Sequence, residues 1–120
     1  MTFEHELRGA VRLLPGDLAP WMSRALRGGW FSLTASAYEN GGPGGAVCPI
    51  AAAAMLAGAW VGGGIGDGHE EWGTVEGPSP EVEDFAAYFD ICAEEVGLDQ
   101  TIAIVSEALA EDAAIRQLAA

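Results

Sequence analysis

The chain has 120 residues, half of them hydrophobic, which indicates one folded domain rather than a disordered segment. Eighteen acidic residues against five arginines and no lysine give a formal net charge of −13. A charge of this sign repels phosphate backbones and anionic lipids, so we expect neither nucleic acid nor membrane among the partners.

Residues 1–29 are predicted to form two short helices that hold four of the five arginines. Apolar residues recur at helical spacing from Phe3 to Leu14, and Pro15 and Gly16 end the first helix. Asp17 is a suitable N-cap for the second helix. The chain after residue 29 has fifteen acids against Arg116, which predicts an acidic surface if the fold separates the two parts.

Residues 30–48 are predicted to form a small β-hairpin. Apolar and polar residues alternate from Trp30 to Tyr38, glycines and a proline mark a turn over residues 39–45, and Ala46 to Cys48 return as a short strand. A lone two-stranded ribbon is marginal in water. We therefore expect it to lie against helices or to pair with a ribbon from another subunit.

Residues 49–61 are predicted to form an alanine-rich central helix that begins at Pro49. The uncharged run 46–66 is long enough for a membrane span. Pro49 and the glycines at 62–64 interrupt it, which favours a buried core helix. The N-terminal residues do not have the pattern of a secretory signal, so a cytoplasmic location is the expectation.

Residues 62–80 are predicted to form a long, glycine-rich acidic loop, and residues 81–118 a helical hairpin. In the hairpin, an apolar stripe runs along the first helix and includes Cys92, Gly97 takes a left-handed conformation at the turn, and Asp99 caps the second helix. The expected fold class is α+β and mainly helical, with four to five helices around the alanine-rich central helix and one small β-hairpin.

Two sets of residues are candidates for a functional site. Cys48 precedes a helix N-terminus, where the helix dipole lowers a thiol pKa, and His69 in the glycine-rich loop is a candidate base for it. A free cysteine is also a common core residue, so packing is the alternative for Cys48, as it is for Cys92. The second set consists of loop residues that would contact a partner, with the indole as the anchor: Asp67, Glu70, Glu71 and Trp72.

The sequence predicts neither a metal nor a cofactor. The loop carboxylates and His69 do not have zinc or calcium spacing, and the glycine run does not match the dinucleotide fingerprint.

The favoured hypothesis is a small acidic protein without catalytic activity that binds or regulates another protein, a basic one, through its negative surface. The alternative is a small cysteine-dependent enzyme or thiol-reactive protein that uses Cys48 with His69. A third alternative is a subunit that forms a homodimer.

Overall fold

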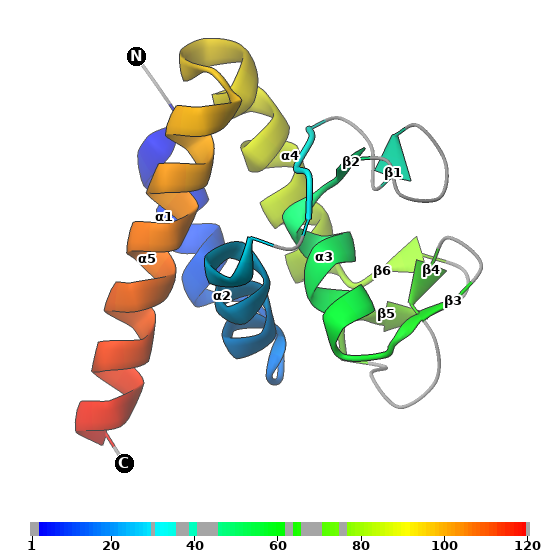
Figure 1. Ribbon diagram of the computed structural model, residues 1–120. Coiled ribbons are helices and arrows are strands. Elements are labelled where there is room, and N and C mark those ends of the chain that lie inside the picture. Colours follow the sequence, from blue (N-terminus) through cyan, green and yellow to red (C-terminus); the bar gives the residue numbers. More distant parts are fainter. Residues whose placement is uncertain are drawn as a thin grey trace.

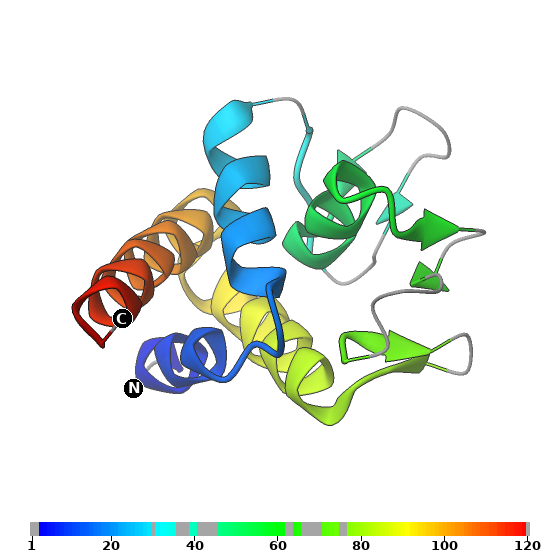
Figure 2. The same ribbon diagram turned by 90° about the horizontal axis from the view of Figure 1, so that it is seen from below.

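A computed structural model describes residues 3–29, 31–35, 39–40, 46–61, 64–65, 71–74 and 77–119. The described part is mainly helical with short antiparallel strand pairs, which confirms the mainly helical α+β class. Seen from below, the four longer helices gather on one side of α3 and the strand pairs on the other (Figure 2).

The first two helices are α1 (Glu4–Arg12) and α2 (Leu18–Gly28). α1 is amphipathic, and Leu7 and Val11 from its apolar side are buried, as is Leu14 just after the helix. The chain turns between the helices at Gly16, whose φ of 57° favours glycine. Asp17 is the N-cap of α2, where its carboxylate accepts a hydrogen bond from Trp21 Nε1 at 3.1 Å.

The last two helices are α4 (Pro80–Val96) and α5 (Leu98–Ala119). Gly97 separates them with φ 90° and ψ 158°, which lies outside the left-handed helical region expected there. α5 begins at Leu98, so Asp99 stands inside its first turn rather than at the cap. The hydroxyl of Thr101 instead donates to the Gly97 carbonyl at 2.7 Å, across the first turn.

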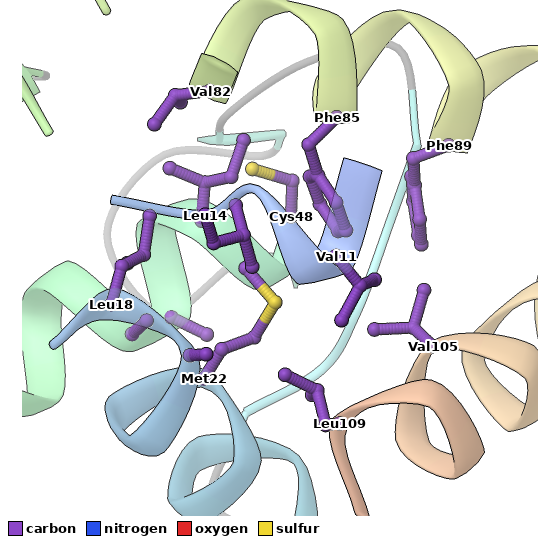
Figure 3. Packing of buried hydrophobic residues seen from close by; sticks show 14 of the residues in the cluster. Val11, Leu14, Leu18, Met22, Cys48, Val82, Phe85, Phe89, Val105 and Leu109 are labelled. Carbon is purple, nitrogen blue, oxygen red and sulfur yellow. The ribbon is translucent and has the colours of Figure 1, made fainter. Parts of the chain in front are cut away.

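α1, α2, α4 and α5 pack into a bundle around one apolar core (Figure 1). α1 and α5 run in the same direction where they touch, since Arg8 reaches Glu107 and Arg12 reaches Glu111. The core between the helices contains residues from all four of them (Figure 3), among them Val11, Met22, Phe85, Phe89, Val105 and Leu109.

α3 (Pro49–Leu56) is the most completely buried helix, because every residue from Pro49 to Ala54 is buried. It packs against α2 and lies between that helix and the strand pairs (Figure 1). Four consecutive alanines have small side chains, so the backbone of α2 packs close to that of α3. The helix ends at Leu56, earlier than the predicted boundary at residue 61.

Three two-residue antiparallel strand pairs complete the described fold. β1 (Glu39–Asn40) pairs with β2 (Ala46–Val47), β3 (Trp60–Val61) with β4 (Gly64–Ile65), and β5 (Gly73–Thr74) with β6 (Gly77–Pro78). Two of the three pairs include parts of the predicted loop 62–80.

The described residues 31–35 do not form the predicted first strand of the hairpin. They meet β2 only in a parallel bridge between Leu33 and Val47, where Thr34 N donates to Val47 O at 2.9 Å. Alternation along a sequence indicates an extended chain but does not determine its partner or direction. The antiparallel partner of β2 is β1, which lies inside the predicted turn.

Within the described residues, no helix combines the length and apolar content that crossing a bilayer requires.

Candidate functional site

Cys48 occupies the N-cap of α3, the position that the sequence predicted for it. Its Sγ accepts a hydrogen bond from the Ala51 amide at 3.4 Å, and only 7% of the residue is exposed. The side chain lies in the core cluster with Leu14, Val82 and Phe85 (Figure 3). The thiol is therefore packed within apolar side chains rather than presented to solvent.

Burial raises the pKa of Cys48 to about 11. The amides of Ala51 and Ile50 at the helix start lower the pKa, and the nearby charge of Asp90 raises it further, but removal from water is the largest effect. A thiol with this pKa is almost fully protonated at neutral pH and is a poor nucleophile. The packing alternative for Cys48 therefore agrees with its surroundings, and the nucleophile hypothesis does not.

His69, the candidate base, lies outside the described residues, as do Asp67 and Glu70. Cys92 is a free, buried thiol on α4, and burial raises its pKa too. Among the residues that the structure describes, no group of three or more histidine, cysteine or carboxylate side chains is placed to hold a metal ion.

Trp72 is fully buried, which contradicts its predicted role as an exposed anchor. Its backbone carbonyl accepts a hydrogen bond from Ser79 N at 3.0 Å, which closes the segment around β5 and β6 and leaves the indole in the core. Polar neighbours in the sequence suggested exposure, but the indole is a large apolar group, and the fold of this segment buries it regardless of those neighbours.

Glu71 is the remaining predicted binding residue, and it is exposed. Its side chain lies over the turn between α1 and α2, where a Cβ on Gly16 would come within 2.6 Å of Glu71 Cγ. Glu71 thus stands apart from Trp72, which points inward, and the two do not form one contact surface.

A groove of about 250 Å³ between α1 and α4 brings together exposed residues that the sequence analysis did not single out. Three carboxylates, Glu6, Glu81 and Asp84, line it, and no basic residue does. Its apolar lining includes Leu13, a large hydrophobic residue with 67% of its surface exposed, and the ring of Tyr88. We call this the acidic groove.

The arginines leave the charge of the acidic groove uncompensated because they are engaged elsewhere. Arg8 bonds Glu4 at 3.2 Å and reaches Glu107 at 3.4 Å. Arg116 bonds Asp112 at 2.8 Å, and Arg24 lies over the Trp21 ring at 4.8 Å.

The residues of the acidic groove have helical spacing in the sequence, but this spacing predicts a groove only when the pairing of the helices is known. Glu6 in α1 and Leu13, the C-cap of α1, are seven residues apart and therefore lie on one side of the helix. Glu81 and Asp84 are three residues apart on α4. Each spacing is visible in the sequence. The contact that places α1 beside α4, seventy residues later in the chain, is not.

The chain matches no known protein family, no curated protein and no solved structure, so the candidate site rests on its own geometry.

Proposed function

We propose that this protein is a non-catalytic binding module that takes a basic, amphipathic segment of a partner protein in the acidic groove between α1 and α4. The supporting observation is the combination of three carboxylates with an exposed leucine and a tyrosine ring in one groove. A helix with one apolar face and flanking arginine or lysine residues meets both requirements.

The apolar and the acidic residues of the groove would have different roles in binding. Leu13 and Tyr88 offer apolar surface, which would be buried against the partner and would provide most of the affinity. Glu6, Glu81 and Asp84 stand around this surface and would select a basic partner and accelerate its approach. With a net charge of −13, the rest of the molecule steers in the same direction.

The cysteine-dependent enzyme is not our proposal, because a buried Cys48 thiol with a pKa of about 11 lacks the activation that such chemistry needs.

The test uses two synthetic helical peptides with leucines at the same positions, one with arginine and the other with glutamate on the polar face. We expect isothermal titration calorimetry to detect binding of the arginine peptide alone. Binding should weaken as salt rises from about 50 to 300 mM, because the carboxylates are exposed and screened. Binding that is independent of salt, or equal for both peptides, would contradict the proposal.

A charge-matched pair of variants locates the site. The triple variant Glu6→Gln, Glu81→Gln, Asp84→Asn removes three charges from the groove. The control Glu83→Gln, Glu94→Gln, Asp99→Asn removes three exposed charges elsewhere on α4 and α5. At low salt the groove variant should bind about tenfold more weakly than the control, from about 0.5 kcal/mol for each exposed charge. Equal weakening would mean that the peptide responds to net charge and not to the groove.

A further inference from the structure

A second groove lies between α2 and α5, which pack against each other (Figure 1). Its volume is about 200 Å³, and it shares no lining residue with the acidic groove. The charged residues that line it are Arg24, Arg27, Asp112 and Arg116. Three of the five arginines of the chain therefore border one groove on a molecule with a net charge of −13. We call this the arginine groove.

Helical spacing brings the charged side chains to the arginine groove. Arg24 and Arg27 are three residues apart and share one face of α2. Asp112 and Arg116 are four residues apart and share one face of α5. Because both faces border the same groove, guanidinium groups from two helices are available to one ligand.

The two arginines of α2 are positioned by neighbours on their own helix. The guanidinium of Arg24 lies over the Trp21 ring, 4.8 Å from its centroid. Arg27 Nε donates to the Ser23 carbonyl at 3.4 Å. These contacts lower the side-chain entropy that would be lost on binding a ligand. Within the described chain neither arginine forms an ion pair, so both keep their charge for the groove.

Arg116 differs, because it is bound to the carboxylate of the groove. Its Nε donates to Asp112 Oδ2 at 2.8 Å, and Asp112 is the one charged residue that is buried in the described part of the chain. Asp112 therefore orients Arg116 and balances one positive charge. The lining retains two positive charges, three from the arginines less one from the aspartate.

This arrangement is complementary to a phosphate monoester. The phosphate group carries a charge of about −1.5 to −2 at pH 7 and has three strong acceptor oxygens. Guanidinium groups match phosphate oxygens in a bidentate geometry. Three cations around one groove repel each other, and a dianion between them replaces this repulsion with attraction. A ligand with a single negative charge would leave one positive charge unbalanced.

The net charge of the protein does not exclude such a ligand. At physiological ionic strength the interactions of exposed charges are screened beyond about 8 Å, so arginines in contact with the phosphate outweigh distant carboxylates. A nucleic-acid strand would extend past the arginine groove onto acidic surface and would be repelled there. The charge distribution therefore favours a small molecule.

An adjoining groove of about 420 Å³ continues the space along the same two helices. The two grooves share Ser23, Arg27, Leu109 and Ala113. Apart from Arg27, the described residues that line the adjoining groove are uncharged, and they include Leu26, Ala110 and Ala114. Sites for small molecules usually have volumes of roughly 300–1,000 Å³ and a mostly apolar lining, and the two grooves together meet both conditions.

We propose that the arginine groove binds a small phosphate monoester, whose phosphate lies between Arg24, Arg27 and Arg116 and whose uncharged body lies in the adjoining groove. The ligand is held by charge at one end and by apolar contact at the other. Because the site lies between α2 and α5, it leaves the acidic groove between α1 and α4 open. This inference does not rest on the proposed function, and the two can fail separately.

The experiment is an NMR titration of the full chain at about 150 mM salt with naphthyl phosphate, naphthalenesulfonate and inorganic phosphate as probes. We expect naphthyl phosphate to produce saturable shifts at the Nε–H groups of Arg24, Arg27 and Arg116. The sulfonate has the same body with one charge, and inorganic phosphate has the charge without the body. Each should bind at least about fivefold more weakly than naphthyl phosphate. Equal binding of the ester and either comparison probe, or no saturable shift at these arginines, would overturn the proposal.

A charge-matched pair of variants separates the site from the net charge. Arg27→Gln and Arg12→Gln each remove one exposed arginine, but only Arg27 lines the arginine groove. Arg27→Gln should weaken binding of naphthyl phosphate at least about fivefold, and Arg12→Gln less than about twofold. Equal weakening by the two variants would mean that the probe responds to net charge, and it would refute the site.

A second pair adds a carboxylate instead of removing an arginine. Ala113→Glu places it in the arginine groove, whereas Ala103→Glu places it at another exposed alanine of α5. Ala113→Glu should weaken binding of naphthyl phosphate at least about tenfold, and Ala103→Glu should have little effect. A phosphoserine peptide that binds more tightly than naphthyl phosphate would assign the arginines to a phosphorylated protein, and it would overturn the small-molecule ligand.

Discussion

The thiol of Cys48 makes the stability of this protein depend on pH in an alkaline range where few other groups titrate. Its pKa is 9.0 in the unfolded chain and about 11 in the folded protein. Between these values the unfolded state releases a proton that the folded state retains, so stability falls as pH rises. Below pH 9 both states hold the proton and Cys48 contributes no slope.

The expected loss of stability follows from the difference between the pKa values of Cys48 in the folded and unfolded states. One pKa unit corresponds to about 1.4 kcal/mol, so the wild type should lose about 1.4 kcal/mol through Cys48 between pH 8 and pH 10. The loss approaches about 3 kcal/mol above pH 11. Lysine titration, which usually obscures this range, is absent because the chain has no lysine.

The assay is urea denaturation of the wild type and of Cys48→Ala at pH 8 and pH 10. The stability advantage of the wild type over the variant should shrink by about 1.4 kcal/mol between the two pH values. Both proteins share the two tyrosines and Cys92, so their contributions cancel in this difference. An unchanged difference would refute the raised pKa. A difference that grows with pH would mean that the helix N-terminus stabilises the thiolate, and it would revive the nucleophile hypothesis.

Four further substitutions test the packing and the backbone conformations described above. Trp72→Ala should destabilise the fold by about 3–5 kcal/mol in urea denaturation, because the indole is fully buried, and a cost below about 1 kcal/mol would contradict that burial. Ser79→Ala should change stability by less than about 0.5 kcal/mol in thermal denaturation, although Ser79 is the N-cap of α4. Its buried hydroxyl makes no capping bond and has no hydrogen-bond partner among the described residues. Gly97→Ala should cost about 1–3 kcal/mol by the same measurement, because φ 90° with ψ 158° suits glycine alone. Gly9→Ala inside α1 should instead stabilise the protein by about 0.5–1 kcal/mol. Similar effects for both substitutions would contradict the backbone conformation of Gly97.

The helical part of the fold was predictable from the sequence because helix periodicity is a local property. The stripe through Val82, Phe85 and Phe89 repeats at three and four residues, and these residues are all buried on α4. Helix ends are also marked locally, by Gly29 in the left-handed conformation and by Pro80 in the first turn of α4.

The strands and the site were less predictable because each depends on which segments pair in the folded chain, and sequence periodicity does not specify this pairing. Gly73 shows why: its φ of 148° and a Cβ that would lie 2.7 Å from the Gly77 carbonyl oxygen explain its identity, but only once β5 and β6 are paired. The indole of Trp72 enters the core through the same pairing. Its polar sequence neighbours predicted an exposed anchor, whereas the exposed apolar residue of the acidic groove is Leu13.

The pairing of α1 with α4 and α5 also determines when the protein folds during its synthesis. α2 and α3 follow each other closely and are made almost together, but Arg12 meets Glu111 only after about a hundred further residues have been added. At roughly 5–20 residues per second, the part of α1 that packs on α5 remains uncovered for roughly five to twenty seconds on the ribosome. The bundle therefore closes only after α5 has been made, and a product that stops before α5 leaves part of α1 open to proteases and chaperones.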